Sequence, residues 1–283
     1  MFQTWHLFAL ATVFFSSIAS LVIRSLMKHD KNDPVLFMIV FQFMLTAITL
    51  IFALYKGFVS PFPMELWPRM LLSAVLYAAG SLCNFYSSRH LGAGEMTILT
   101  ASGALVTILL GVFLLGNSFT VLNGVGTVLI LLSILVLYAG ERMKMNSGVW
   151  YALGVAFFYG IAVVNDVVII RTYNPISFVP VMSFLPGLII ALVFFKKLTH
   201  MKKLFRLKPL SHVAIYSAFY GIAAVTFYQA LDSGAAVSQL SPISRASIIV
   251  TIILSALFLN ERKDIAKKIV SALLVSVGVL FLA

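Results

Sequence analysis

The chain is divided along its whole length into apolar runs of about 20 residues, the length of helix that crosses a hydrocarbon core of about 30 Å. Of the 283 residues, 61% are hydrophobic and only 10% are charged, and the mean hydropathy is +1.05. Soluble domains of ordinary composition do not reach these values. Because helices satisfy their own backbone hydrogen bonds in lipid, the sequence predicts an all-α membrane protein.

Ten spans can be delimited, and turn-forming residues separate them. They are Thr4–Met27, Pro34–Tyr55, Trp67–Ser88, Ala93–Leu115, Phe119–Ala139, Gly148–Arg171, Pro175–Phe195, Ser211–Leu231, Ala235–Leu259 and Ala266–Ala283. The first span is expected to be retained, because its N-terminal side lacks the basic region of a signal peptide and the run is too long for one. A single cysteine, Cys83, excludes an internal disulfide and a thiolate metal cluster.

Short sequence similarities indicate an internal duplication. Phe14-Phe15 recurs as Phe157-Phe158, and Phe85-Tyr86 recurs as Phe227-Tyr228 at nearly the same separation along the chain. We therefore predict two five-helix repeats, residues 1–145 and 146–283. Because five spans is an odd number, the second repeat must enter the membrane from the opposite face. Inverted repeats of this kind are typical of secondary transporters, which bind substrate near the midplane between the repeats.

The distribution of Lys and Arg predicts the orientation. Sixteen of the 20 basic residues fall in the connections after spans 1, 3, 5, 7 and 9 or beside them, whereas the other connections hold only Lys56, Arg69 and Arg171. The positive-inside rule places the first set in the cytoplasm and both termini outside the cell membrane. It also explains the net charge of +11, so nucleic acid is not an expected partner. The expected partners are a small-molecule metabolite and membrane lipids; the oligomeric state stays open, and a monomer fits the pattern.

Several short motifs resemble the drug/metabolite transporter superfamily, in particular its EamA-like ten-helix branch. Leu114-Leu115-Gly116-Asn117 and Phe258-Leu259-Asn260-Glu261-Arg262 resemble the family's "LLGE(R)" segment before the last span of each repeat. Ser241-Pro242 matches a proline common in span 9, and Gly124 and Gly278 resemble glycines of the closing helices. The resemblance implies a metabolite carrier that works by alternating access, with a cavity lined mainly by spans 1, 3, 4, 6, 8 and 9.

The first repeat departs from this pattern at two places. Asn117 stands where the family favours glutamate, and Ser102-Gly103 stands where it favours a proline. The N-terminus also lacks the basic residues that family members often carry there, since no Lys or Arg precedes Arg24.

Arg245 lies near the middle of span 9 and is the leading candidate for a substrate ligand. An arginine at the centre of a span costs roughly 2.5–3.5 kcal/mol, and such residues usually face a bundle interior or a watery cavity. Its fixed charge and forked donors suit a carboxylate or phosphate. The alternative is a structural charge satisfied by an acid or by carbonyls freed at Pro242. Ser238, Ser241 and Arg245 share one helix face, as a cavity wall requires.

Asp166 is the only acid well inside a predicted span, and Tyr159 lies seven residues earlier on the same face. The carboxylate could pair with Arg245, bind a substrate ammonium or take up a coupling proton. The alternative is an acid near the interface that reaches out to water.

Other polar stripes follow the helical period. Span 3 carries Tyr77, Ser81, Asn84 and Ser88, and span 8 carries Tyr216, Tyr220 and Tyr228. Such residues often belong to a core, but these two spans are among those that the resemblance places at the cavity. Arg24 near the end of span 1 is interpreted as an interfacial charge, and Gln42 on span 2 as an interhelical hydrogen-bonding residue.

Catalytic patterns are not found: no histidine stands at metal-ligand spacing from another ligand, and there is no phosphate loop or nucleophile elbow. We therefore expect no enzyme and no cofactor, with proton coupling as an open option. The predicted function is export of a small anionic or zwitterionic metabolite, such as an amino acid. The alternatives are a flippase for a lipid-linked phosphate, or a membrane-embedded enzyme or assembly subunit. The predicted substrate-binding residues are Arg245, Asp166, Tyr159, Tyr77, Asn84, Tyr220, Ser241 and Ser238.

Overall fold

The structure is a computed structural model, and it describes residues 4–28, 32–60, 62–115, 118–139, 146–199, 207–235 and 237–282. Throughout these ranges the secondary structure is helical. The helices are α1 (Thr4–Met27), α2 (Pro34–Lys56), η1 (Met64–Leu66), α3 (Trp67–His90), α4 (Ala93–Ala101), α5 (Gly103–Leu115), α6 (Val121–Leu137), α7 (Ser147–Ile170), α8 (Pro175–Val193), α9 (Phe195–Leu198), α10 (Leu207–Asp232), α11 (Val237–Phe258) and α12 (Ile265–Leu282).

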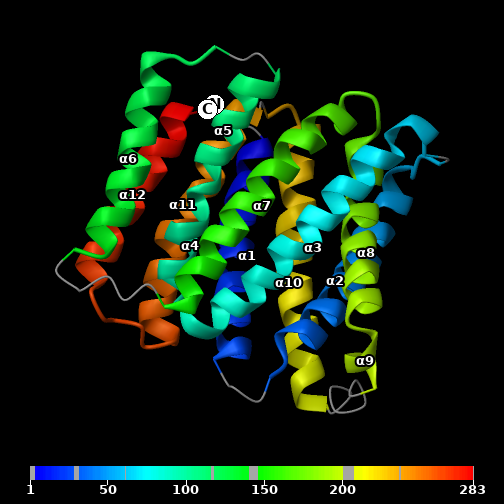
Figure 1. The fold of residues 1–283 in the computed structure, drawn as a ribbon, viewed down its shortest axis with the longest axis horizontal. Helices are drawn as coiled ribbons and strands as arrows, with labels where there is room; N and C mark the ends of the chain where they lie inside the picture. The colour runs from blue at the N-terminus through cyan, green and yellow to red at the C-terminus, as the bar shows by residue number, and fades with distance from the viewer. Residues whose placement is uncertain are drawn as a thin grey trace.

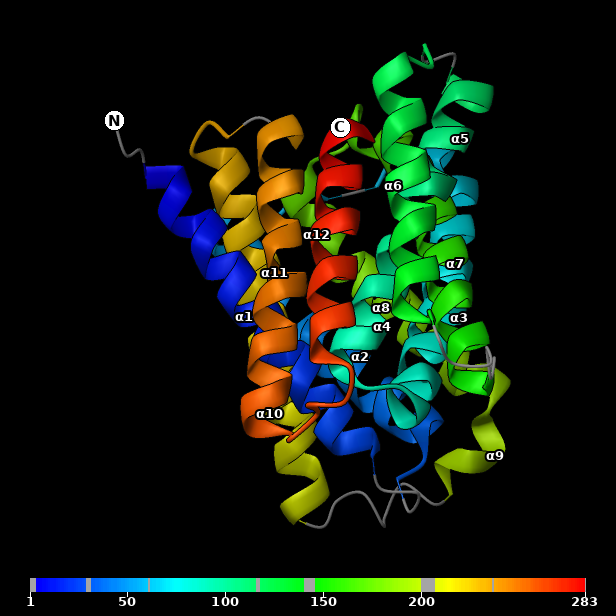
Figure 2. The same ribbon diagram turned by 90° about the vertical axis from the view of Figure 1, so that its left-hand side faces the viewer.

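In the described ranges, eight helical segments are long and apolar enough to span a membrane, and the shorter apolar helices Val121–Leu137 and Ile243–Phe258 add two more. The prediction of an all-α membrane protein with ten spans is confirmed. Figures 1 and 2 show the helices packed as one bundle, in which the described chain begins and ends at the same end. We call this the terminal end, marked by Thr4 and Leu282. The opposite end, marked by Lys28, Lys197 and Arg262, is the basic end.

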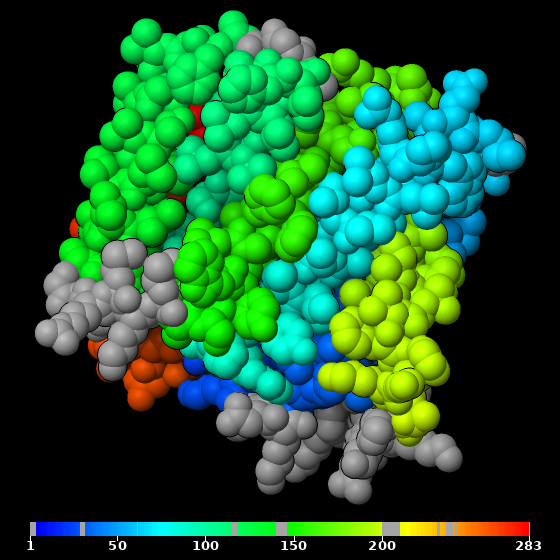
Figure 3. Space-filling model, in the orientation of Figure 1, coloured from blue at the N-terminus to red at the C-terminus, as the bar shows by residue number. Residues whose placement is uncertain are grey.

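The packing of the helices shows an inverted repeat. In Figure 1, α1 runs away from the terminal end whereas its counterpart α7 runs toward it. Contacts between the repeats come in related pairs, because α3 packs on α7 as α1 packs on α10. Three further pairs, α2 with α8, α4 with α11 and α6 with α12, each join a helix to its own counterpart. Seen from one side, α7 and α3 cross the middle of the molecule between α6 and α8 (Figure 3).

Polar residues at the helix starts cap the helices. The side chains of Asp33, Asn146 and Asn174 accept hydrogen bonds from the first turns of α2, α7 and α8. Thr120 and Asn123 form a capping box at the start of α6. These bonds satisfy backbone N–H groups that have no partner within the helix, so the helix starts are set locally by sequence.

The predicted span Ala93–Leu115 is not one continuous helix. It divides into α4 and α5 at Ser102, whose hydroxyl donates to the Leu99 carbonyl oxygen at 2.6 Å. A serine that bonds back to its own helix competes with the regular ladder, and the glycine that follows adds freedom. Gly103 also lies against α7, where an added Cβ would be 2.9 Å from the Ala156 carbonyl oxygen.

Candidate functional site

Asp166 lies at the interface between the two repeats, one turn before the end of α7. The residue is only 9% exposed. Its two carboxylate oxygens accept hydrogen bonds from α3, one from the Ser73 hydroxyl and one from the Tyr77 hydroxyl, each at 2.5 Å. Among the residues that the structure describes, no cation is paired with it. Within the described part of the chain, the carboxylate is therefore held by hydroxyl groups alone.

A second set of bonds links this carboxylate to the terminal end. The Asn165 amide donates to the Ser73 hydroxyl and to the Arg69 carbonyl oxygen, both at 2.8 Å. The Arg69 guanidinium donates to the Asn165 side-chain oxygen at 3.3 Å. Arg69 is exposed in the first turn of α3. A series of hydrogen-bonded polar side chains therefore connects the terminal end to Asp166.

Tyr159 lies two turns before Asp166 on α7 and also contacts α3. Its hydroxyl lies 2.8 Å from the Ser81 hydroxyl, which also accepts a bond from the Gln42 amide at 3.0 Å. The Tyr77 and Tyr159 rings are 5.4 Å apart. A Cβ on Gly80 would fall 2.4 Å from the Tyr159 ring, so the missing side chain is what lets the ring lie on α3.

The tyrosines of α10 approach this region from the other side. Tyr216 is buried, with its ring 4.5 Å from that of Phe41 and 5.8 Å from that of Phe85, and Asn84 lies beside its hydroxyl. Tyr220 packs edge-on against Phe41 at 5.3 Å but remains 39% exposed. Tyr220 is thus an aromatic side chain of α10 that stays partly accessible, whereas Tyr216 belongs to the core.

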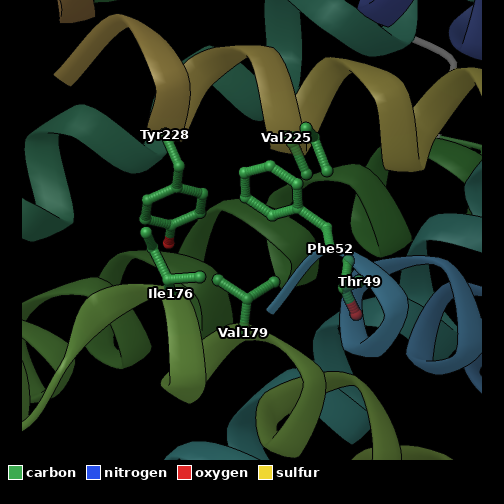
Figure 4. Close-up of a pocket in the computed structure, with 7 residues that line it drawn as sticks. Thr49, Phe52, Ile176, Val179, Val225 and Tyr228 are labelled. Atoms are coloured by element: carbon green, nitrogen blue, oxygen red, sulfur yellow. The ribbon is translucent and has the colours of Figure 1, made fainter. Parts of the chain in front are cut away.

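A small cavity lies between α2, α8 and α10 (Figure 4). Its free volume, opening included, is ≈ 220 Å³, and its lining residues are Thr49, Phe52, Ile176, Val179, Ala224, Val225 and Tyr228. The Thr49 hydroxyl bonds to the Leu45 carbonyl oxygen of its own helix, so Tyr228 supplies the available polar group. The Tyr228 hydroxyl, which points toward Ile176 in Figure 4, is close enough to Asp166 to interact with it electrostatically.

Arg245 lies on α11 and is partly exposed. Within the described part of the chain its guanidinium has no hydrogen bond, no ion pair and no charged neighbour. It is therefore not paired with Asp166. The side chains of Ser238 and Ser241, predicted to share its face, lie outside the described residues, although both positions are in α11.

An ion pair joins the two repeats at the basic end. Arg24 of α1 donates to Glu261 through Nε at 2.9 Å, and through Nη1 to the carbonyl oxygens of Ser88 and Arg89 at 3.0 and 2.9 Å. The other oxygen of Glu261 accepts from the Ala93 backbone N–H at 2.8 Å. The two side chains are 14% and 12% exposed. They join the end of α3 and the start of α4 to the second repeat.

The chain after α11 turns so that Glu261 faces this junction. Asn260 has φ 58°, the left-handed conformation that asparagine tolerates better than most residues. The next N–H, that of Glu261, then bonds back to the Ser255 carbonyl oxygen at 3.2 Å. This helix-ending turn is formed by the motif that carried the family resemblance.

The structure therefore brings together part of the predicted set. Asp166 and Tyr77 bond directly, and Tyr159 packs on Tyr77. The contacts of Arg245 in the described part of the chain do not include these residues. Ser73 and Asn165 were missed, although Ser73 lies one turn before Tyr77 on the same stripe and could have been found by extending it.

Comparison with known proteins agrees with this architecture. The sequence model of the EamA-like transporter family matches residues 3–139 and again residues 146–283. The chain belongs to this family, and it is an integral, multi-pass membrane transporter. No curated protein matches the sequence.

Solved structures share the fold. One of them, titled only "Crystal structure of protein", superposes with a TM-score of 0.68 at 15% sequence identity. The match covers 98% of this chain and 96% of the other. At this identity the likeness shows the fold alone.

Proposed function

We propose that this transporter is a secondary carrier that exports a small anionic or zwitterionic metabolite, such as an amino acid, by alternating access. Arg245 carries the proposal, because a guanidinium inside a span with no partner among the described residues is costly and a bound carboxylate would offset that cost. A forked guanidinium can hold a carboxylate through two parallel hydrogen bonds. Tyr220 supplies further aromatic surface.

The proposed orientation follows the positive charge. The basic end would face the cytoplasm and the terminal end the outside of the cell membrane. With the Arg24–Glu261 pair closing the basic end, the structure would represent a state closed toward the cytoplasm. Units 1–145 and 146–283 would then move against each other during transport.

A thermal-shift screen tests whether Arg245 holds an anion. The probes are L-amino acids and their amides, in which a neutral carboxamide replaces the carboxylate. We expect at least one acid to raise the melting temperature of the wild-type protein while its amide does not. A ligand at about 100 times its Kd stabilises the native state by about 2.7 kcal/mol. Arg245→Gln should abolish the shift, and Arg245→Lys should weaken it, because lysine lacks the fork.

Arg171→Gln is the matched control, since Arg171 is an exposed arginine just after α7 and should leave the shift unchanged. An acid that stabilises Arg245→Gln as much as the wild-type protein would remove the anchor role. Stabilisation by inorganic phosphate and by none of the acids would instead favour the flippase.

A further inference from the structure

We propose that Asp166 is the site at which this transporter binds its coupling proton, with Ser73 and Tyr77 as positioning residues. This inference rests on the proposed transport function and adds the ion that drives it. The proton would come from water at the terminal end and be released on the cytoplasmic side, so no other reactant is needed.

The partners of the carboxylate suit a group that gains and loses a proton. Serine and tyrosine hydroxyls can donate or accept. Ser73 and Tyr77 can therefore both donate to the ionised carboxylate, and one of them can turn to accept when it is protonated. An arginine could not do this, because it only donates and would hold the carboxylate ionised. No guanidinium contacts Asp166 directly among the described residues.

The position of the carboxylate can couple protonation to movement. Both of its hydrogen bonds cross from α7 of the second repeat to α3 of the first. Alternating access moves one repeat against the other. A change in these bonds would therefore alter the contact between α3 and α7, which must rearrange during transport. The same helices pack on each other along much of their length, as Figure 3 shows.

Hydrogen bonds also connect Asp166 to the terminal end. Asn165 bonds to Ser73 and to the exposed first turn of α3 at Arg69. The Ser73 hydroxyl thus bonds to Asp166 and to the buried Asn165 amide, which in turn bonds to the exposed Arg69. In the proposed orientation this end faces outside, where protons would enter during export.

Few other ionisable groups face Asp166. Those nearby are Tyr77 and Arg69 of α3, Tyr159 of α7 itself, and Tyr228 of α10. Helices α5 and α8 contain no ionisable side chain, and the one acid of α4, Glu95, is in its first turn beside Tyr138. Asp166 is therefore the carboxyl group at this interface among the described residues, and its neighbours there are hydroxyl and phenol groups together with Arg69.

Transport in proteoliposomes separates proton coupling from substrate binding. The probe is the radiolabelled L-amino acid that gives the largest thermal shift. Wild-type protein should accumulate it when a pH gradient is imposed and exchange it when the pH is equal on both sides. Asp166→Asn should keep the exchange and lose the gradient-driven accumulation, so that the internal concentration no longer exceeds the external one. Glu65→Gln, an exposed acid of η1 changed in the same way, is the control.

Three outcomes would overturn the proposal. Accumulation by Asp166→Asn equal to that of the wild-type protein would remove the proton site. Loss of exchange together with accumulation in folded Asp166→Asn would make Asp166 a substrate ligand. If the wild-type protein exchanges the probe but a pH gradient does not drive its accumulation, the carrier is not coupled to protons. The proposed transport function would then still stand.

Two further readouts apply if Asp166→Asn does not fold or no probe is transported. In infrared difference spectra recorded across a pH titration of substrate-free protein, Tyr77→Phe and Ser73→Ala should each shift the titration of one buried carboxyl band. With a transported probe they should also shift the pH profile of uptake. Titrations unchanged in both variants would contradict the assignment, independently of whether a substrate is known.

Discussion

Replacement of Glu261 by alanine is expected to lower the free energy of unfolding by about 3 kcal/mol, the cost of removing one partner of a buried ion pair, and to loosen the basic end. The reason is that Arg24 would keep its charge, uncompensated, in a place where its side chain is 14% exposed. The Ala93 N–H at the start of α4 would lose its acceptor as well. Thermal unfolding in detergent measures the effect.

A charge reversal distinguishes this junction from an ordinary ion pair. Arg24→Glu combined with Glu261→Arg restores opposite charges, but a glutamate at position 24 cannot donate to the carbonyl oxygens of Ser88 and Arg89. An arginine at position 261 likewise cannot accept from Ala93. The double variant should therefore remain destabilised. Recovery of the wild-type melting temperature would mean that the charges alone matter.

The pair of Lys197 with Asp33 at the same end is the matched control. It has a similar length, 2.7 Å, but its side chains are 38% and 34% exposed. Exposed pairs contribute about 0–1 kcal/mol. Lys197→Ala should therefore change the melting temperature far less than Arg24→Ala.

Gly126→Ala is expected to lower the free energy of unfolding by about 2 kcal/mol, a typical cost of extra atoms in a tightly packed contact. The contact is the crossing of α6 and α12. A Cβ on Gly126 would be 2.6 Å from the Gly278 carbonyl oxygen, and a Cβ on Gly278 would be 2.8 Å from the Gly126 carbonyl oxygen. Close backbone approach at small residues holds membrane helices together. Thermal unfolding in detergent measures this loss too.

Gly124→Ala serves as the control on the same helix. Its added Cβ would have Phe119 as nearest neighbour, at 3.8 Å, which is ordinary contact. Alanine also favours helix over glycine by roughly 0.5–1 kcal/mol, so this variant should be neutral or slightly more stable. Equal losses of melting temperature for both variants would contradict a close crossing at Gly126.

Much of the fold could be predicted because the membrane restricts the options so strongly. Apolar run length predicted the spans, and Asp33, Asn146 and Asn174 lie where the helices start. The break between α4 and α5 was missed, because an unbroken apolar run of spanning length reads as one helix. Ser102 bonds back to its own helix and Gly103 lies close against α7, and periodicity reports neither contact.

The sequence predicted which helix faces carry the candidate site, but not which side chains bond to each other. Helical spacing put Tyr77 on a polar stripe and marked Asp166 as unusual, yet it could not show that the two bond across the repeats. The duplication makes contact between spans 3 and 6 natural, but register along the helices decides which side chains meet. Arg24 was interpreted as an interfacial charge because it lies about one turn from the end of span 1. Its acceptor, Glu261, lies far away along the chain, in a connection of the second repeat.

Transport by purified protein in proteoliposomes tests the central claim most directly. We expect uptake of the acid found in the thermal-shift screen to exceed that of protein-free liposomes and to fall about a hundredfold in Arg245→Ala. That factor corresponds to the loss of a charged hydrogen-bonding interaction of about 2.7 kcal/mol. Uptake of the same acid by Arg245→Ala at the wild-type rate would contradict the claim that Arg245 binds the substrate anion.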